Sequence, residues 1–591
     1  MNPYRRLRPK LAALAAALSI SIPVSVEAAA GSASAAAPFA NAESTLSAAS
    51  SAASVTYAAS AVSSASDAST DSVAAAKTSV QSAFLPFDDI SGSFALADIV
   101  ALHGRGIVSG TGERTFSPER AVTRAEFAAL VVRLFGLEPV DAAIPSYPDV
   151  PAKAWSYSAV EAASQLGIVR GVSAASFGGG SPVTREQAAT ILVRALRLDG
   201  ERASASGANA PDYEDADRID DWAEASIQTA ARAGLMQGDN GRFRPLDTLT
   251  RAEAAAVLNR IASRDGWAAQ FEAAPATGLQ LGWQYGQTTS QFIASIARST
   301  VDTLVPRDYF LESARTVSDS TDPALVRWAS AHGKRVWGMV GNRSDAEVTH
   351  QLLGSASNRK AVADRLAALV LDDGLDGLNL DFENVLPEDR SGLTAFVTEL
   401  AAKLHANGRV LSVNVSPDQG DDWTAAFDYS ALGKQADYIV LMAYDEHWST
   451  DPVAGSVSSL PWLARGVDKL LAAVPASKTI VALPLYTRKW TVSPAVSSAE
   501  LSLIEQTDVI RSLVSGTRSW NETIGQYVYS YSRGGSSYRI WTEDSRSLTL
   551  KNLAAADRGV AGLAYWYIGA ETPDVWPAMR NAAKYSAFEF E

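Results

Sequence analysis

The chain has 591 residues, more than one ordinary hydrophobic core needs, so we expect two or more domains. It contains no cysteine, which excludes disulfides, iron–sulfur clusters and cysteine nucleophiles. The formal net charge of −14 argues against general binding of nucleic acid. The five histidines are scattered and form no His-Glu-x-x-His pair, so the sequence indicates no zinc hydrolase, and we expect neither metal nor cofactor.

The first 30 residues have the pattern of a secretory signal peptide. A basic start, "MNPYRRLRPK", is followed by the apolar run "LAALAAALSISIPVSV" and then by small residues. Pro23 interrupts the apolar run, which disfavours a membrane anchor, and we expect no membrane association after cleavage. Residues 31–84 are almost entirely Ala, Ser, Thr and Val, so they cannot bury enough apolar area to fold and predict a flexible spacer.

Three related blocks follow, at residues 85–140, 146–200 and 212–264. Each block predicts a helix that ends near a glycine, a loop, and a second helix that starts at a threonine. The three threonines are followed three residues later by Glu or Gln, which is the pattern of a capping box: they are Thr123, Thr184 and Thr250.

An arginine follows each of these threonines: Arg124, Arg185 and Arg251. The capping box does not require it, and we expect its side chain to point outward from the first helical turn. A guanidinium at three equivalent positions predicts an anion site, because its planar fork matches a carboxylate.

These blocks resemble S-layer homology domains, with the entry motifs "FDDI", "YPDV" and "YEDA". The resemblance implies a helical assembly with pseudo-threefold symmetry whose grooves bind a pyruvylated secondary cell-wall polymer. It assigns Trp155 and Trp222 to the grooves, whereas the first block has only Phe94 nearby. We therefore expect a secreted protein held non-covalently at a Gram-positive cell wall or S-layer.

After a linker at residues 265–277, short apolar runs alternate with helical ones from residue 278 to 591. The eight predicted strands are 279–285, 301–310, 335–342, 377–383, 411–417, 437–445, 480–487 and 562–569. Eight strands with intervening helices predict a (β/α)8 barrel, that is, a TIM barrel. The longer interval before the last strand predicts a small α+β insertion between strands 7 and 8. The predicted fold is therefore multidomain, with an all-α triplet followed by an α/β barrel.

The fourth predicted strand, in "DGLNLDFENV", alternates apolar residues with Asn379, Asp381 and Glu383. Parallel strands are usually apolar on both faces, so the acidic face is unusual. Asn379 alone could be a structural residue whose amide is hydrogen-bonded by other buried polar groups of the protein. Burying the two carboxyl groups of Asp381 and Glu383 without a function, however, would cost folding free energy. Tyr444, Asp445 and Trp566 also end strands, and the carboxyl ends of barrel strands form one mouth.

This stretch resembles the signature Asp-Gly-x-Asp-x-Asp-x-Glu of glycoside hydrolase family 18. "NLDFENVLPEDR" and "LMAYDEHW" resemble most its spore-cortex-lytic and peptidoglycan-glucosaminidase branch. The resemblance implies that Glu383 is the general acid/base and that Asp381 stabilises the substrate's N-acetyl group, which attacks the anomeric carbon. It also implies that Tyr444 hydrogen-bonds the acetamido group and that Trp566 is the floor under the sugar.

Four further residues are predicted to bind substrate: Asp376, where the signature begins, Asn379, Asp445 and Trp283. Asn379 stands where most members have a middle Asp, and we expect its amide to donate a hydrogen bond to Asp381. We also expect the neighbouring carboxylate to raise the pKa of Glu383.

Three functions remain open. Peptidoglycan is the preferred substrate because of the predicted wall anchor, and chitin or a chitin-like glycan is the alternative. The third possibility is a wall protein that binds glycan without cleaving it, against which the complete set of Asp381, Glu383 and Tyr444 argues.

Overall fold

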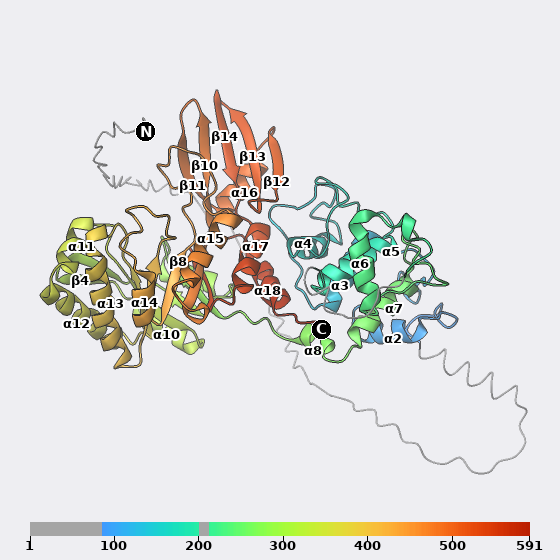
Figure 1. Cartoon of the computed structure of the whole chain (residues 1–591), viewed down its shortest axis with the longest axis horizontal. Helices are drawn as coiled ribbons and strands as arrows, with labels where there is room; N and C mark the ends of the chain where they lie inside the picture. Colours follow the sequence, from blue (N-terminus) through green and yellow to red (C-terminus); the bar gives the residue numbers. More distant parts are fainter. Residues whose placement is uncertain (1–84, 200–211, 591) are drawn as a thin grey trace, which may run out of the picture. The chain divides into compact units, whose positions relative to one another are not determined.

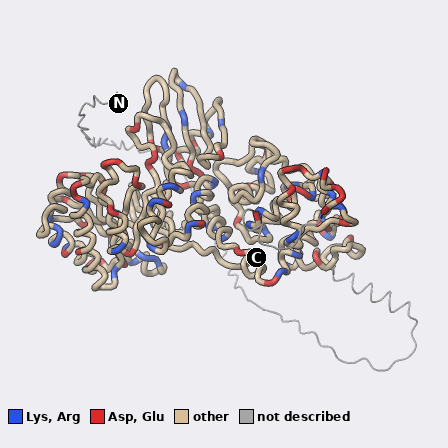
Figure 2. Tube along the Cα trace, viewed as in Figure 1, with Lys and Arg blue, Asp and Glu red and all other residues tan. Residues whose placement is uncertain are grey.

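The computed structural model describes residues 85–199 and 212–590 (Figure 1). The predicted signal peptide and spacer, residues 1–84, lie outside them. Within the described ranges, no helix has both the length and the apolar composition that crossing a membrane requires. Figure 2 shows acidic and basic residues interspersed along the described trace, without one long stretch of a single sign.

The region of residues 85–264 consists of three helix pairs, as predicted. The helices are α2 (Leu96–Gly104) and α3 (Arg124–Leu134), α4 (Tyr157–Gln165) and α5 (Arg185–Ala195), α6 (Asp221–Arg232) and α7 (Arg251–Ala262), with a short 3-10 turn, η2, at Ala216–Arg218. The predicted capping boxes are confirmed, since each threonine accepts a hydrogen bond from the backbone N–H three residues later. Each first helix ends just before a glycine with positive φ (Gly106, Gly167 and Gly234).

Backbone hydrogen bonds link the three repeats in a ring. Val122 N–H donates to Leu249 C=O at 2.9 Å, Leu249 N–H to Val183 C=O at 3.0 Å, and Val183 N–H to Val122 C=O at 2.9 Å. Each repeat therefore donates to one neighbour and accepts from the other. The pseudo-threefold assembly follows from this closed cycle.

The expectation that the three repeated arginines point outward is wrong. Arg124 is only 6% exposed, and its guanidinium lies over the ring of Phe177 in the next repeat, 5.0 Å from the centroid. Its Nε donates to Phe177 C=O at 3.1 Å and its Nη2 to Arg170 C=O at 2.7 Å. Arg185 and Arg251 make the equivalent contacts, the latter back to the first repeat.

The physical reason lies in the loops. Packing the repeats together buries loop carbonyl oxygens, and a buried carbonyl needs a donor. A guanidinium supplies several N–H groups in one plane and can also stack on an aromatic ring. These arginines therefore hold consecutive repeats together.

The second half of the chain is a closed parallel barrel, as predicted. Its eight strands are β1 (Leu279–Trp283), β2 (Thr303–Val305), β5 (Arg335–Gly341), β6 (Gly377–Asp381), β7 (Val410–Val415), β8 (Tyr438–Met442), β9 (Thr479–Pro484) and β15 (Gly562–Trp566). The barrel closes because β2 pairs with both β1 and β5, and β1 pairs with β15. An apolar cluster that includes Leu281, Trp337, Met339 and Val440 fills its interior.

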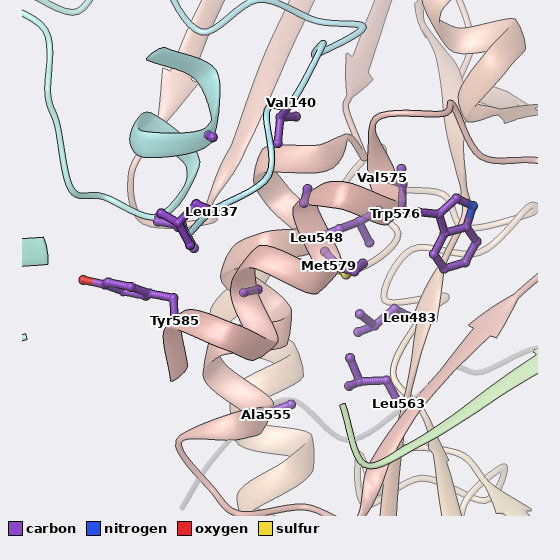
Figure 3. Packing of buried hydrophobic residues seen from close by; sticks show 14 of the residues in the cluster. Leu137, Val140, Leu483, Leu548, Ala555, Leu563, Val575, Trp576, Met579 and Tyr585 are labelled. Atoms are coloured by element: carbon purple, nitrogen blue, oxygen red, sulfur yellow. The ribbon is translucent and has the colours of Figure 1, made fainter. Parts of the chain in front are cut away.

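Helices cover the outside of the barrel. They are α9 (Thr289–Ile296), α10 (Pro323–Ala331), α11 (Ala346–Leu353), α12 (Ala356–Asp372), α13 (Arg390–His405), α14 (Tyr429–Gln435), α15 (Leu460–Leu471), α17 (Ser545–Ala556) and α18 (Val575–Ser586), with 3-10 turns η3 (Pro387–Asp389) and η4 (Ala476–Lys478). Figure 3 shows Leu548 of α17 and Met579 of α18 beside Leu483 and Leu563 of two barrel strands. The outer faces of the strands are thus buried by helices, as parallel sheets require.

The predicted strand 301–310 is divided in two. β2 ends at Val305, and after Pro306, Arg307 and Asp308 a separate strand begins, β3 (Tyr309–Ser313), which forms a hairpin with β4 (Thr316–Asp319). Proline has no N–H to donate to a neighbouring strand, so the ladder stops there. The break leaves Arg307 at the carboxyl end of β2.

The insertion between the seventh and eighth barrel strands consists of five strands and one helix, in keeping with the predicted α+β insertion. It comprises β10 (Tyr486–Ser493), β11 (Ser497–Ser502), α16 (Leu503–Arg511), β12 (Thr517–Asn521), β13 (Gln526–Arg533) and β14 (Ser536–Trp541). Its strands form one antiparallel sheet in the order β11-β10-β14-β13-β12. The stretch expected to be a linker, 265–277, contains a short helix, α8 (Trp267–Glu272), whose Trp267 and Phe271 are buried.

Replacing Arg124 by Met should lower the free energy of unfolding of the three-repeat region by about 2 kcal/mol, because buried carbonyl oxygens lose their donor. Differential scanning calorimetry measures this as an earlier transition. Arg242→Met is the control, since Arg242 is exposed and pairs only with the exposed Glu214. Equal shifts in the two variants would show that Arg124 does not hold the repeats together.

Candidate active site

The alternation in β6 separates two environments. Leu378 and Leu380 are buried in the core beneath the outer helices, whereas Asn379 and Asp381 face the interior of the barrel. The strand ends at Asp381, and Glu383 lies two residues beyond it, at the carboxyl end. The acidic face of the sequence is therefore the inner face of the barrel at its mouth.

Asn379 is fully buried, and protein groups satisfy its whole amide. Its Nδ2 donates to Asn414 Oδ1 at 2.8 Å and to Ser412 Oγ at 2.9 Å. Its Oδ1 accepts from Trp283 Nε1 at 3.1 Å and from Asn414 Nδ2 at 3.2 Å. With no group left for substrate, Asn379 belongs to the barrel's internal polar ladder, and its prediction as a substrate-binding residue is not supported.

The hydrogen bond to Asp381 comes from a different amide. Asn414 Nδ2 donates to Asp381 Oδ1 at 2.9 Å, so the expectation that Asn379 would do so is wrong. Burial and, second, the charge of Glu383 raise the pKa of Asp381, and the Asn414 hydrogen bond opposes this rise. Asp381 therefore ionises less readily than an exposed aspartate.

Glu383 is held at both its backbone and its side chain. Asn342 accepts from its N–H at 3.0 Å and donates to its C=O at 2.7 Å, while Ser344 Oγ donates to Glu383 Oε2 at 3.0 Å. Burial is the largest cause of the raised pKa of Glu383, and the charge of Asp445 adds to it. The sequence interpretation named a neighbouring carboxylate as the cause, but desolvation contributes more.

Tyr444 and Asp445 follow β8 and line the same cavity as Glu383. Burial and the nearby Asp381 and Glu383 raise the pKa of Tyr444 well above its usual value, so its phenol keeps its proton. Asp445 has a φ of 60° and accepts a hydrogen bond from Tyr486 Oη at 2.6 Å. The insertion, through Tyr486, thus helps to position a residue of the barrel mouth.

Trp566 ends β15, with its ring against Trp283 and Tyr285 at centroid distances of 6.0 and 5.4 Å. Trp283 is only 1% exposed, so it supports Trp566 and Asn379 from below instead of touching a ligand. Asp376 precedes β6 at the opposite end of the barrel, where it accepts from Val336 N–H at 2.8 Å. The structure therefore does not bring Asp376 into the site.

A cavity of about 450 Å³ opens beside Glu383 at the end of β8. Its lining includes Glu383, Tyr444 and Asp445, and also Trp423 and Trp448, each 47% exposed. Half-exposed tryptophans in a cavity are typical of surfaces that stack on sugar rings. Within residues 85–199 and 212–590, no cluster of three or more His, Asp or Glu side chains is arranged to hold a metal ion.

Sequence reasoning missed several residues of this site. Asn414 carries a detectable signal, because "LSVNVSP" alternates polar and apolar residues just as β6 does. Ser344 and Asn342 follow β5 at the same mouth, which also could have marked them. Trp423 and Trp448 lie in loops, where no periodicity indicates a direction for the side chain.

Comparison with family models matches residues 312–571 to glycosyl hydrolases family 18 and residues 86–128, 146–189 and 212–255 to the S-layer homology domain. The chain contains a glycosyl hydrolases family 18 domain and three S-layer homology domains. Both resemblances seen in the sequence are confirmed.

Three curated proteins illustrate the relationship of this chain to others. The uncharacterized glycosylase YvbX of Bacillus subtilis is 24% identical over 53% of this chain and 93% of its own length. The cortical fragment-lytic enzyme of Bacillus subtilis is 25% identical over 45% of this chain and 62% of its own length. The surface-layer 125 kDa protein of Lysinibacillus sphaericus is 32% identical over 29% of this chain and 14% of its own length.

The two hydrogen bonds to the catalytic candidates should control opposite limbs of the pH profile. Asn414→Ala removes a donor that lowers the pKa of Asp381; this pKa then rises, and the acid limb of kcat/KM moves to higher pH. Ser344→Ala removes a donor that lowers the pKa of Glu383; Glu383 then stays protonated to higher pH, and the alkaline limb moves up.

Hydrolysis of a fluorogenic N-acetylglucosamine oligomer across pH measures both effects. Ser357→Ala, at an exposed position in α12, is the control and should leave both limbs in place. If Asn414→Ala and Ser344→Ala moved the same limb, the separate roles of Asp381 and Glu383 would be contradicted.

Proposed function

We propose that the barrel hydrolyses β-1,4 bonds of a glycan that contains N-acetylglucosamine, with retention of configuration and with the substrate's own acetamido group as nucleophile. The observation that carries this proposal is the pairing of Asp381 and Glu383 at the mouth, with raised pKa values and separate hydrogen-bond donors. Family membership and this pair together favour an enzyme over a binding protein.

In the proposed reaction, Glu383 is the general acid. Because burial raises its pKa, Glu383 keeps its proton to higher pH than an exposed glutamate does and can donate it to the oxygen of the glycosidic bond. As the bond breaks, the acetamido oxygen attacks the anomeric carbon of the same sugar. Glu383, now ionised, then takes a proton from the water that opens the cyclic intermediate.

Asp381 and Tyr444 act on the acetamido group. In its ionised form, Asp381 accepts a hydrogen bond from the acetamido N–H and stabilises the positive charge that develops there. Asn414 keeps Asp381 oriented through its bond to Oδ1. The neutral phenol of Tyr444 donates to the acetamido oxygen, and Trp566 supports the sugar ring from below.

Peptidoglycan is the preferred substrate in this proposal. A relative named as a cortical fragment-lytic enzyme is 25% identical over 45% of this chain, and the S-layer homology domains would hold the barrel at a wall surface rich in this glycan. A displayed chitinase is the alternative, since chitin offers the same acetamido sugar. The third alternative is a wall protein that binds glycan but does not cleave it.

The three repeats would attach the protein to the cell surface through a pyruvylated wall polymer. Phe94, Trp155 and Trp222 are 72%, 68% and 51% exposed, so each repeat presents one aromatic side chain. Trp155 lines a cavity of about 420 Å³ together with Arg120 and Arg251. Arg251 already donates to two loop carbonyls and Arg120 pairs with Glu126, so the exposed indole and the local positive charge, rather than free guanidinium donors, would favour a carboxylated sugar.

The substrate is tested by digesting purified peptidoglycan and chitooligosaccharides and identifying the products by mass spectrometry. Wild type should release glycans with reducing-end N-acetylglucosamine from peptidoglycan, and Glu383→Gln should lower the rate by at least about 10²-fold, since it lacks the general acid. Glu388→Gln, an exposed residue nearby, is the matched control and should be fully active.

The other outcomes distinguish the alternatives. Cleavage of chitooligosaccharides alone would assign a displayed chitinase. Binding of either glycan without cleavage would assign a wall-bound lectin and contradict the proposed enzyme.

Attachment is tested by co-sedimentation with purified cell walls before and after mild acid removal of the pyruvyl groups. Trp155→Ala should weaken sedimentation with intact walls, because it removes the aromatic wall of the Arg251 cavity. Val172→Ala, at another exposed apolar site, which lies outside this cavity, is the control. Unchanged sedimentation after pyruvyl removal would contradict recognition of that group.

A further inference from the structure

A second cavity, of about 290 Å³, lies at the carboxyl ends of β1 and β2. Its lining includes Gln284, Tyr285, Gln287, Arg307 and Phe310. Arg307 enters this cavity because Pro306 ends β2 and turns the chain toward β3. None of the catalytic roles described above uses it.

The guanidinium of Arg307 is held in place by two aromatic rings. Its Cζ lies 5.1 Å from the centroid of Tyr285 and 5.1 Å from that of Phe310. Contacts of this kind fix a cation without consuming its N–H donors. The side chain is thus preorganised for a ligand.

The N–H donors of Arg307 are not used within the described part of the chain. Its Nε is buried without a hydrogen-bond partner. Within the described residues, 85–199 and 212–590, Arg307 forms no ion pair. By contrast, Arg343, whose guanidinium lies 4.2 Å from the centroid of Phe310, is paired with Glu312 at 2.7 Å. An unpaired guanidinium with a buried Nε, beside a cavity, needs an acceptor.

Two carboxyl groups also line this cavity, and neither neutralises Arg307. Asp322 caps α10, accepting from Ala324 N–H at 2.9 Å and from Thr289 Oγ1 at 2.5 Å. Asp308 is buried, with Oδ2 close to Gly338, and burial with nearby carboxylates raises its pKa to about 7. The fixed positive charge of Arg307 therefore remains available to a ligand.

The position of this cavity relative to the cleaved bond follows from Glu383. The general acid lines the cavity of Trp423 and Trp448, so the leaving group lies on that side. The Arg307 cavity adjoins Trp566 through Tyr285, whose ring contacts Trp566 at 5.4 Å and Arg307 at 5.1 Å. It therefore lies on the non-reducing side of the sugar over Trp566.

We propose that Arg307 binds a carboxylate carried by the sugar that precedes the one over Trp566, on its non-reducing side. This proposal rests on the proposed function and deepens it, because it distinguishes two glycans. In peptidoglycan the preceding sugar is N-acetylmuramic acid, whose lactyl carboxyl is an amide where it carries a peptide stem and a free carboxylate where the stem has been removed. In chitin the preceding sugar is N-acetylglucosamine, which has no carboxyl group. A bidentate pair with the free carboxylate would make the cleft selective for wall glycan whose peptide stems have been removed.

Arg307 has one competing role. Its charge also lowers the pKa values of Asp381 and Glu383, so its removal can alter catalysis without any effect on a ligand. That role changes the hydrolysis of every substrate alike. Recognition of a carboxylate changes only the carboxylated one.

The test uses the full chain with Glu383→Gln, which binds without turnover, and measures affinity by calorimetry. Three ligands are compared: glycan strands freed of peptide, the same strands with their carboxyl groups converted to amides, and chitohexaose. Arg307→Gln should weaken binding of the carboxylated strands by about tenfold or more, as for loss of a charged hydrogen bond. Binding of the amidated strands and of chitohexaose should change far less, and it reports that the variant is folded.

Arg343→Gln is the matched control, because it removes a neighbouring guanidinium that is already paired. Arg307→Lys, which keeps the charge but lacks the fork, should show an intermediate loss. Equal weakening of all three ligands, or unchanged binding of the carboxylated strands, would overturn the proposal. Since binding needs no catalysis, failure of the proposed hydrolysis of peptidoglycan would be a separate result.

Discussion

The site depends on one constraint, that a polar group buried inside a closed barrel is costly unless it finds a hydrogen-bond partner there. No water-facing side is available at the level of Asn379, and the apolar cluster around Leu281 and Met339 offers no hydrogen bonds. Asn379 and Asn414 satisfy this constraint because their side-chain amides hydrogen-bond to each other. The Nδ2 of Asn414 also donates a hydrogen bond to Asp381. The carboxyl group of Asp381 is thus the outermost member of a ladder that begins in the core.

This arrangement also explains why the two carboxyl groups, Asp381 and Glu383, have different hydrogen-bond donors. Asp381 receives its donor from inside the barrel, on a strand, whereas Glu383 receives its donor from the loop residue Ser344. Each group can therefore be tuned by its own neighbour, although both are desolvated and close together. The donor to Asp381 is Asn414 on strand β7, and the donor to Glu383 is Ser344 in the loop after β5.

Much of this was predictable from periodicity and capping. The three capping boxes, the eight barrel strands and the position of Glu383 and Asp381 follow from local patterns. The buried position of Arg124 could not be predicted from local patterns, because its partners, Phe177 and Arg170, belong to the next repeat. Asn379 was likewise assigned to substrate because a sequence does not reveal that Asn414 and Trp283 satisfy its amide. Local signals identify elements, whereas partners distant in the sequence decide which polar side chains remain free.

The ring of hydrogen bonds through Val122, Val183 and Leu249 has a mechanical consequence. In a linear array, a tensile load applied at one end can peel off the terminal unit by breaking one junction. In a ring of three units, freeing any unit requires two junctions to break, each reinforced by a buried arginine. An anchor built in this way resists shear at a surface without disulfides, in a chain that contains no cysteine.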